Sequence, residues 1–428
     1  MDQKVLPAAQ LKGTIAPPPD KSISHRSVMF AALHQGVSTI ENFSEAADPH
    51  STVSCFRSLG VEIEQHRSTL TVHGVGRDGF RHPQQDLDCG NSGTTMRLLS
   101  GILAGAGISC TLVGDESLSA RTMRRIIDPL EKMGARIKAR QDDYAPLSIS
   151  RPGSLIPLRF ELPIPSAQLK SCVLLAGLFG KEPTQVIERI PSRDHTERLL
   201  DLGIEKAGNT RIISSSRQDV IPEQSYTIPG DFSAAAFWLA AGAIHPRAEI
   251  ELPGTGLNPT RTAFLDILRE MGANIRIEQE RQAGQEPVGD ITVAGSELKP
   301  INISSERVPN CIDELPILAV AMLFADGVSR ISGAEELRHK ETDRLNAVAE
   351  ILENAGADFT EYEDGLEING SPDFTPRPAR YNSYHDHRIA MAAGVLSLLA
   401  DSPSTVLGAE CTAISYPSFW DDLQLLTN

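Results

Sequence analysis

The stretch Leu268-Arg-Glu-Met-Gly-Ala is one copy of a phrase that recurs along the 428-residue chain. In each copy a helical Leu-x-x-x-Gly pattern, or a close variant of it, leads into a strand-like segment. A glycine directly after a helix is typical of a left-handed cap, so we expect a positive φ at each. The glycines follow one another at intervals of about 70 to 85 residues, which indicates a repeat protein. They are Gly60, Gly134, Gly203, Gly272 and Gly356. A sixth copy, Phe419-Trp-Asp-Asp-Leu, reaches the last residues of the chain before any glycine.

A second phrase alternates with the first and consists of a nearly all-apolar helix opened by small polar or charged residues. Helices that are apolar on all sides are buried, whereas the amphipathic helices of the first phrase face solvent on one side. The six copies begin near Lys21-Ser-Ile-Ser, Asn91-Ser-Gly-Thr, Pro165-Ser-Ala-Gln, Gly230-Asp-Phe-Ser, Ile312-Asp-Glu-Leu and His385-Asp-His-Arg.

This alternation predicts an α/β fold of six units, each with one buried helix, one surface helix and several short strands. Proline-rich seams at Pro17-Pro18-Pro19 and Pro229-Gly230 separate the first three units from the last three. We therefore expect two domains. One contains residues 19–228, and the other contains residues 1–18 and 229–428, with the N-terminal strand joining the second half.

The composition restricts the partners of the protein. Its 40 basic and 56 acidic side chains give a formal net charge of −16, which disfavours nucleic acids and anionic membranes, because both are bound by basic surfaces. The longest apolar runs are about a dozen residues, short of the roughly 20 that span a bilayer. Six scattered cysteines with no C-x-x-C pattern indicate reduced thiols. We expect a cytoplasmic protein.

The starts of the buried helices are candidate anion sites. A helix N-terminus carries partial positive charge and free N–H groups, and small residues allow a ligand to approach closely. Cations accompany four of the six starts: Lys21 and Arg26, Arg97, Lys170, and Arg388. The alternative for any single start is that its Ser, Thr or Asp is only a helix cap. Four starts with cations in one chain favour a site for small anions.

Two further clusters support an anion site. Arg121 with Arg124 and Arg125, and Arg338 with Lys340 and Arg344, stand where surface helices are expected to begin. Lys340 and Arg344 are four residues apart and are expected to share one helix face. Cations at a helix start are unfavourable because they oppose the helix dipole, and binding of an anionic ligand would explain why they are there. The alternative is a surface ion-pair face of little energetic value.

Other signals are weak. His385 and His387 have the spacing of metal ligands, but no third ligand is evident, and we expect no metal site. Gly90-Asn-Ser-Gly93 is neither a Walker loop nor a G-x-G-x-x-G pattern. Asp194-His195-Thr-Glu197 is explained most simply as a capped helix start.

Taken together, the motifs resemble the 5-enolpyruvylshikimate-3-phosphate (EPSP) synthase family of enolpyruvyl transferases, in the family's order, over residues 5 to 422. The motifs are Asp20-Lys-Ser-Ile-Ser-His-Arg, Gly90-Asn-Ser-Gly-Thr-Thr-Met-Arg, Gly114-Asp-Glu-Ser-Leu-Ser-Ala-Arg, Ser166-Ala-Gln, Asp313-Glu-Leu-Pro, Lys340-Glu-Thr-Asp-Arg and Asp386-His-Arg.

The resemblance implies a two-domain inside-out α/β barrel with six βαβαββ repeats, three in each domain. It implies transfer of the enolpyruvyl group of phosphoenolpyruvate to the 5-hydroxyl of shikimate 3-phosphate, without a metal or organic cofactor. It also implies a monomer that binds two small anionic substrates and neither nucleic acid nor membrane.

The resemblance assigns roles to individual residues. Those expected to bind shikimate 3-phosphate are Lys21, Ser22, Arg26, Ser166, Ala167, Gln168, Arg193, Asp313 and Lys340. Those expected to bind phosphoenolpyruvate are Lys21, Asn91, Gly93, Thr94, Arg121, Gln168, Glu341, Arg344 and Arg388. Asp313 is expected to accept the proton of the 5-hydroxyl, Glu341 to protonate the methylene carbon, and Lys21 to act at the reacting centre.

Several positions depart from the best-known family pattern. Ala167 replaces a second serine, His195 stands at a tyrosine position and Glu336 stands where many members have asparagine, while Arg193 resembles the phosphate ligand of another branch. Ile414 replaces a lysine, which removes one cation for phosphoenolpyruvate. Gly93, which has no Cβ, is expected to leave room for glyphosate, the family's inhibitor that competes with phosphoenolpyruvate.

Three alternatives remain. UDP-N-acetylglucosamine enolpyruvyl transferases share the fold but carry a cysteine five residues before the arginine that aligns with Arg121, where this chain has Glu116. RNA 3′-terminal phosphate cyclases share the repeat but are disfavoured by the net charge of −16. A non-catalytic anion-binding protein would not need the carboxylates of Asp313 and Glu341.

Overall fold

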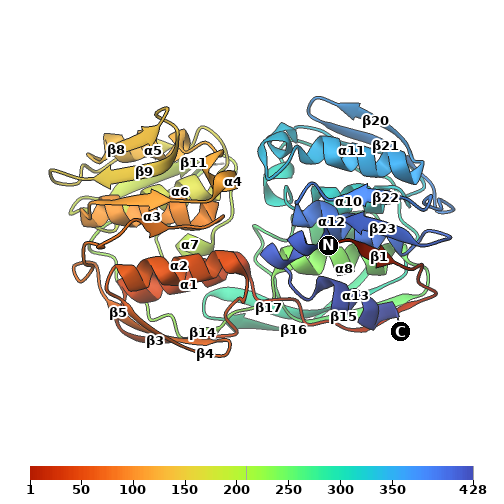
Figure 1. Ribbon diagram of the computed structural model, residues 1–428, viewed down its shortest axis with the longest axis horizontal. Coiled ribbons are helices and arrows are strands. Elements are labelled where there is room, and N and C mark those ends of the chain that lie inside the picture. Colours follow the sequence, from red (N-terminus) through yellow and green to blue (C-terminus); the bar gives the residue numbers. More distant parts are fainter. Residues whose placement is uncertain (209, 428) are drawn as a thin grey trace. The chain divides into compact units, whose positions relative to one another are not determined.

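The computed structural model describes residues 1–208 and 210–427. The chain divides into two compact units (Figure 1). Unit 1 contains Met1–Pro18, Pro229–Arg281 and Pro287–Asn428, and unit 2 contains Pro19–Ile228 and Gln282–Glu286. The short segment Gln282–Glu286 differs from our expectation, which placed it in the other domain. It belongs to unit 2, where buried Glu286 Oε1 lies 2.7 Å from Nδ1 of buried His195.

Six helices among the described residues correspond to the second phrase and are buried along nearly all of their length, as predicted. Their apolar sequences leave no face for solvent, so each unit is built around three of them. In unit 2 they are α1 (Lys21–Leu33), α3 (Gly93–Ala106) and α6 (Ala167–Gly177). In unit 1 they are α8 (Phe232–Ile244), α10 (Leu315–Met322) and α12 (His387–Ser397).

The helices of the first phrase lie outside these, with one exception. They are α2 (Ala47–Ser58), α5 (Arg124–Lys132), α7 (His195–Leu199), α9 (Ala263–Glu270), α11 (Arg344–Ala355) and α13 (Phe419–Thr427). The prediction of an amphipathic surface helix is wrong for α7. This helix has five residues, of which four are buried, because Glu197 forms a buried ion pair with Lys170 and His195 a buried hydrogen bond with Glu286.

The strands of unit 2 form three sheets of identical construction. In each sheet the first strand pairs parallel with the second, and two antiparallel pairings follow. In spatial order they are β14 (Tyr226–Thr227), β3 (Gln35–Glu41), β5 (Thr69–Val75) and β4 (Glu62–His66); β6 (Leu87–Asp88), β7 (Cys110–Val113), β9 (Tyr144–Ser150) and β8 (Arg136–Arg140); and β10 (Arg159–Glu161), β11 (Thr184–Glu188), β13 (Thr210–Ser215) and β12 (Ile204–Ala207).

Unit 1 repeats this construction. Two of its sheets have four strands: β2 (Leu11–Thr14), β15 (Ala248–Gly256), β17 (Glu286–Ala294) and β16 (Asn274–Ala283); and β18 (Asn302–Ile303), β19 (Gly327–Ile331), β21 (Gly365–Gly370) and β20 (Asp358–Tyr362). The described part of the third has three: β22 (Arg380–Asn382), β23 (Ser404–Leu407) and β1 (Gln3–Val5). The N-terminal strands thus belong with the second half of the chain, as predicted.

Four of the five predicted glycine caps have the expected conformation. Gly60, Gly134, Gly272 and Gly356 have φ between 77° and 97°. The prediction is wrong at Gly203, because α7 ends at Leu199 and its chain reversal therefore comes earlier. Asp201 takes the left-handed conformation there, with φ of 51°.

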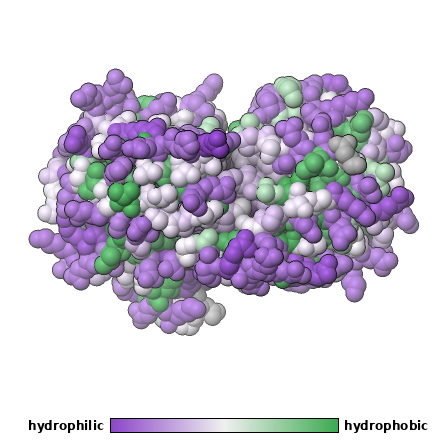
Figure 2. All heavy atoms as spheres, turned by 90° about the horizontal axis from the view of Figure 1, so that it is seen from below, coloured by the Kyte–Doolittle hydropathy of each residue, from purple (hydrophilic) through white to green (hydrophobic). Residues whose placement is uncertain are grey.

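Hydrophilic residues predominate on the face shown in Figure 2, and hydrophobic residues form small separate groups on it. Scattered apolar side chains of this kind are normal on protein surfaces. Within residues 1–208 and 210–427, no helix has both the length and the apolar character needed to cross a bilayer.

Close packing of α3 on α6 gives a first prediction. A Cβ at Gly101 would lie 2.2 Å from Cys172 O, so the backbone of α6 would have to move. Gly101→Ala is expected to destabilise unit 2 by about 1–3 kcal/mol, measured by urea unfolding with circular dichroism. Alkylation of buried Cys172 should also become faster. Gly153→Ala is the control, since its Cβ would meet nothing within 4 Å; equal unfolding of the two variants would contradict the prediction.

Candidate active site

The inner helices of unit 2 begin with side-chain caps. Asp20 Oδ1 accepts a hydrogen bond from Ile23 N at 2.8 Å, and Ser92 Oγ accepts one from Thr95 N at 3.0 Å. Ser166 Oγ accepts from Leu169 N at 3.4 Å. Capping therefore explains these polar residues, as the simpler alternative predicted, but it does not explain the cations beside them.

Lys21 is the first residue of α1 and is half-buried. Its Nζ lies 3.0 Å from Asp48 Oδ2 on α2. Burial raises the pKa of Asp48, but Lys21 and then His25 outweigh this and bring that pKa below its ordinary value. Asp48, which no sequence motif marked, is thus an ionised partner that orients Lys21.

The start of α3 meets the start of α6. Arg97 Nη1 donates to Gln168 Oε1 at 2.7 Å, and Gln168 Nε2 donates to Thr94 Oγ1 at 3.1 Å. Gly93 is buried beside them, and a Cβ there would lie 2.9 Å from Arg97 Nη1. Thr94, Gln168 and the neighbouring Ser166 and Ala167 remain half-exposed. The structure thus brings five predicted residues together with Arg97.

Arg121 also belongs to this group of side chains, but it does not stand at the start of a helix as predicted. It follows the short helix α4 (Glu116–Ser119) and precedes α5, so it does not stand on a helix. Its Nη2 donates to Asn91 Oδ1 at 3.2 Å, and its Nη1 would lie 3.6 Å from a Cβ at Gly93. Arg124, in contrast, forms an exposed ion pair with Asp128 at 2.8 Å. For this arginine the alternative to an anion site, a surface ion pair, is therefore correct.

Arg26 is buried, with 4% of its surface exposed. Its guanidinium donates to Thr196 Oγ1 at 2.9 Å, to Ser171 Oγ at 3.1 Å and to Ser22 O at 3.1 Å. Burial lowers the pKa of Arg26 to about 10, against the charge of Glu197. Two of its five N–H donors are not used by these bonds.

Lys170 does not belong to the anion site, which corrects the expectation for this cation. It is fully buried, and its Nζ lies 3.0 Å from Glu188 Oε2 and 2.7 Å from Glu197 Oε1. It also donates to Ser192 O at 3.3 Å. Lys170 therefore fixes the turn that carries Arg193, whose charge is close enough to lower the pKa of Arg26 further.

His25 gives a prediction for pH dependence. Burial, opposed by Asp48, lowers its pKa to about 3 from an ordinary value of 6.5. The unfolded chain therefore binds the proton first as the pH falls, so this group lowers stability between about pH 6.5 and 3, by up to about 1.4 kcal/mol per pH unit.

Replacing His25 with Gln is expected to flatten this pH slope for unit 2. The measurement is urea unfolding at pH 7, 6 and 5 by far-UV circular dichroism. Both tryptophans, Trp238 and Trp420, belong to unit 1, so their fluorescence serves as the internal control. An unchanged slope in the variant would show that His25 is not the group that titrates.

In unit 1, buried Arg344 is surrounded by three carboxylates. Its Nε lies 2.7 Å from Asp386 Oδ2, its Nη2 lies 2.6 Å from Glu341 Oε2, and its Nη1 lies 3.4 Å from Asp313 Oδ1. Burial would lower the pKa of Arg344, but Asp386, Glu341 and Asp313 together raise it. Arg344 Nη2 also donates to Asp386 Oδ1 at 3.4 Å, so four of the five N–H donors of this guanidinium are used.

Asp313 also meets the second predicted arginine of unit 1. Arg388 Nη1 donates to Asp313 O at 3.0 Å, and Arg388 Nη2 lies 3.6 Å from Asp313 Oδ2. Asp313 precedes α10, and Arg388 stands at the start of α12, so the ends of two inner helices fix this pair.

Lys340 and Glu341 do not lie on a helix, which corrects the prediction that Lys340 and Arg344 share a helix face. A 3₁₀ helix ends at His339 and α11 begins at Arg344, with Asp343 as its cap. Lys340 is half-buried, and burial lowers its pKa. Arg338 lies 3.0 Å from Asp343 and 2.9 Å from Glu361, so this arginine forms the surface ion pairs that were the alternative to an anion site.

Two remaining expectations concern Ile414 and the histidine pair His385 and His387. Ile414 packs against the hydrophobic core of unit 1, so this position supplies no cation. Within residues 1–208 and 210–427, the three residues whose ligand atoms lie close enough for a metal are Glu62, Glu64 and His73, and neither His385 nor His387 joins such a group.

The same architecture occurs in known proteins. A family model described as EPSP synthase (3-phosphoshikimate 1-carboxyvinyltransferase) matches residues 5–423. This chain belongs to the EPSP synthase family. A 3-phosphoshikimate 1-carboxyvinyltransferase from Salinibacter ruber is 51% identical over 427 residues, covering 99% of both chains. One from Bacillus licheniformis is 44% identical over 420 residues, covering 98% of both.

Solved structures agree with this membership. An EPSP synthase from Acinetobacter baumannii has a TM-score of 0.89 at 40% identity, covering 99% of this chain and 98% of that chain. An enolpyruvyl transferase from Streptomyces tendae, at 18% identity and a TM-score of 0.76, shares the fold. The predicted enolpyruvyl-transferase fold is thus confirmed, and the EPSP synthase match disfavours the UDP-N-acetylglucosamine alternative.

Sequence reasoning missed the residues that hold the predicted EPSP synthase side chains in place. Asp48 pairs with Lys21, and Asp386 pairs with Arg344. The Asp-His-Arg motif contained Asp386, and its position before a buried helix was a usable signal. Asp48 is part of no motif.

Proposed function

We propose that this chain transfers the enolpyruvyl group of phosphoenolpyruvate to the 5-hydroxyl of shikimate 3-phosphate, releasing phosphate, in aromatic amino-acid biosynthesis. The observation that carries the proposal is the arrangement of Asp313 and Glu341 on buried Arg344. A protein that only binds anions gains nothing from carboxylates there. An enolpyruvyl transfer needs two groups that exchange protons.

In unit 2, we propose that Ser166, Ala167, Gln168 and Arg193 bind the phosphate and ring of shikimate 3-phosphate, with Ser22 and Arg26 on its hydroxyl and carboxylate side. The half-exposed N-terminus of α6 supports this, because free N–H groups and partial positive charge favour phosphate. The side chains proposed for phosphoenolpyruvate are Lys21, Asn91, Gly93, Thr94 and Arg121.

In unit 1, we propose that Arg344, Arg388 and Lys340 bind substrate anions, while Asp313 and Glu341 move protons. Arg344 has one N–H donor beyond its four bonds, so an anion that takes two donors must displace a carboxylate. A carboxylate that loses a cation neighbour becomes a stronger base. Binding of substrate would in this way prepare Asp313 to accept the proton of the 5-hydroxyl.

The direct test measures phosphate release with both substrates, with each alone, and with UDP-N-acetylglucosamine in place of shikimate 3-phosphate. Release that requires both phosphoenolpyruvate and shikimate 3-phosphate is expected. Release with the UDP-sugar would favour the sister enzyme, and binding of both anions without release would favour a non-catalytic protein.

Glyphosate is expected to inhibit in competition with phosphoenolpyruvate. Gly93 lies beside Arg97 and Arg121, and a Cβ would occupy the space near their guanidinium groups. Gly93→Ala should therefore raise the inhibitor concentration needed, and the missing cation at Ile414 should weaken inhibition in the native chain as well. Initial rates at fixed phosphoenolpyruvate measure this. Insensitivity far above the half-saturating phosphoenolpyruvate concentration would refute it.

A further inference from the structure

Glu314 directly follows the proposed base Asp313 and is almost completely buried in unit 1, with 1% of its surface exposed. It is the last residue before α10, but its side chain accepts no capping hydrogen bond from that helix. Capping therefore does not explain why a carboxylate is buried there. Burying a charged group is costly unless the group is paired, so Glu314 needs partners from other elements.

One partner of Glu314 is Arg388, at the start of α12. Arg388 Nη1 lies 3.9 Å from Glu314 Oε1, and Arg388 Nη2 lies 3.6 Å from Asp313 Oδ2. One guanidinium group is thus shared between two neighbouring carboxylates, and its bond to Asp313 O at 3.0 Å keeps it there. Only 13% of the Arg388 side chain is exposed, so these charges interact more strongly than they would in water.

Glu314 is held in place from a third inner helix, α8. Ser233 Oγ donates a hydrogen bond to Glu314 Oε1 and accepts one from Arg261 Nη2 at 2.6 Å. Arg261 is also buried, and its Nη2 lies 3.3 Å from Asp231 Oδ1. Asp231 in turn caps α8 by accepting a hydrogen bond from Ser233 N at 2.7 Å. The position of Glu314 is therefore set by residues that carry no proposed role in the reaction.

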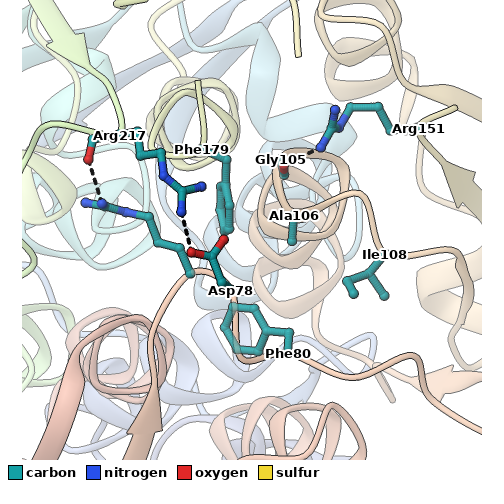
Figure 3. Close-up of a pocket in the computed structure, with 9 residues that line it drawn as sticks. Asp78, Phe80, Gly105, Ala106, Ile108, Arg151, Phe179 and Arg217 are labelled. Carbon is teal, nitrogen blue, oxygen red and sulfur yellow. Dashed lines mark hydrogen bonds and ion pairs between the residues drawn. The ribbon is translucent and has the colours of Figure 1, made fainter. Parts of the chain in front are cut away.

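This arrangement differs from charge clusters that only stabilise the fold. Three arginines line a cavity of about 200 Å³ in unit 2, and Figure 3 shows Arg217 paired with Asp78 and Arg151 bonded to Gly105 O. These bonds hold the end of α3 and the connections after β5 and β13, and the fold alone explains them. Glu314, in contrast, adjoins the proposed base, and its buried Oε2 accepts no hydrogen bond from the described part of the chain. A buried oxygen left unsatisfied costs stability, which points to a function for this carboxylate.

The charge of Glu314 affects the basicity of Asp313 in two ways. A second negative charge nearby disfavours the ionised form of Asp313. Glu314 also competes for Arg388, which would otherwise pair with Asp313 alone. The other cations that face Asp313 are Arg344, at 3.4 Å, and Lys340, whose pKa is lowered by burial and raised by Asp313. All three cations favour the ionised form of Asp313, and Glu314 opposes them.

We infer that Glu314 is a positioning residue for the reaction: it shares Arg388 with Asp313 and so keeps Asp313 basic enough to accept the proton of the 5-hydroxyl. This role rests on the proposed transferase function, and Glu314 acts in it only through Arg388 and Asp313. Ser233 and Arg261 hold the carboxylate in place. The charge of Glu314 is what the role requires, and its exact length is secondary.

Two substitutions separate charge from shape. Glu314→Gln keeps the shape and the bond from Ser233 but removes the charge, whereas Glu314→Asp keeps the charge and shortens the side chain. At saturating substrates, the acid limb of kcat against pH reports ionisation of the base. Glu314→Gln is expected to move this limb to lower pH by about one unit, because Asp313 then ionises more easily. The plateau value of kcat should fall roughly threefold to tenfold, since a weaker base takes up the proton less readily.

Glu314→Asp should keep the acid limb at the native pH. A purely structural role predicts the reverse order, with Glu314→Asp more damaging than Glu314→Gln, and urea unfolding followed by tryptophan fluorescence measures the stability of each. The matched control is Glu353→Gln, which removes the same charge at an exposed position on α11 and should keep the native profile. An unmoved limb in Glu314→Gln would overturn the inference. A shifted limb in Glu314→Asp would also overturn it, even if Glu314→Gln did not fold.

Crystal structures of the native chain and of Glu314→Gln test the role of Glu314 without the reaction. Arg388, left with one carboxylate, should move toward Asp313. The distance from Nη2 to Oδ2 should shorten from 3.6 Å to about 2.7–2.9 Å, the range of a charge-assisted hydrogen bond. An unmoved Arg388 would overturn the inference even if the chain releases phosphate as proposed. Movement of Arg388 in a chain that releases no phosphate would overturn the proposed function instead, with Glu314 confirmed as the second partner of Arg388.

Discussion

Asp313→Asn is expected to lower kcat by roughly 10²–10⁴-fold, the usual contribution of a general base. Asparagine keeps the shape of the side chain, its amide oxygen can still accept a hydrogen bond from Arg344, and the bond from Arg388 to the main-chain oxygen of residue 313 is unaffected, but asparagine cannot take up the proton of the 5-hydroxyl. The KM for shikimate 3-phosphate should change much less than kcat, because the loss occurs in the transition state. Phosphate release under saturating substrates measures the effect.

The control for this variant is Asp326→Asn, an exposed aspartate of the same unit with no proposed role. Its turnover should match that of the native chain. Near-native turnover of Asp313→Asn would remove Asp313 from the mechanism.

Glu341 can be tested separately from Asp313, because their protons go to different atoms. If Glu341 protonates the methylene carbon reversibly, deuterium from solvent should enter the vinyl position of phosphoenolpyruvate when shikimate 3-phosphate is present. Proton NMR of phosphoenolpyruvate in deuterated buffer follows this exchange. Glu341→Gln should suppress it, and exchange at the native rate would assign the carbon proton to another group.

Asp386→Ala is expected to destabilise unit 1 by about 3–5 kcal/mol, the range for breaking a buried ion pair from one side. The Asp386 carboxylate is fully buried and has two functions. It pairs with Arg344 at 2.7 Å, and it caps α12 by accepting a hydrogen bond from Arg388 N at 2.9 Å. Its removal leaves a buried guanidinium with only Glu341 and Asp313, both more exposed, as partners.

Urea unfolding followed by tryptophan fluorescence measures this loss in unit 1 selectively, since both tryptophans are there. Asp386→Asn retains an oxygen that can cap α12 and should fall between Asp386→Ala and the native chain. Asp421→Asn, at an exposed position, should stay within about 0.5 kcal/mol of native stability. Equal stability of Asp386→Ala and Asp421→Asn would rule out a structural role for the Arg344 pair.

The fold could be predicted because its decisive signals are local. A helix that is apolar on all sides, such as residues 232–244, must be buried whatever its surroundings. Each recurrence of the two phrases along the chain likewise indicates one more structural repeat. The exception, α7, shows the limit of this reasoning. Its burial depends on Lys170, which lies 27 residues from its partner Glu197, and on Glu286, which lies 91 residues from its partner His195, and no local pattern shows such contacts.

The candidate site could be predicted only in part, for a related reason. Lys21 and Lys170 both stand in the first turn of a buried helix and look alike in sequence. Lys21 is half-buried next to one carboxylate, whereas Lys170 is enclosed by Glu188 and Glu197. Which lysine can meet a substrate depends on carboxylates elsewhere in the chain, and the sequence around each lysine contains no sign of them.

The pairing of β1 with β23 sets an order of events during synthesis on the ribosome. Residues 19–228 emerge as one continuous segment, and unit 2 then lacks only Gln282–Glu286. Val5 pairs with Ser404, so the first strand must wait until about 400 further residues have been made, roughly 20–80 seconds at usual translation rates. The nascent chain thus carries an unpaired N-terminal strand through most of its elongation, while the half encoded after it is already folding.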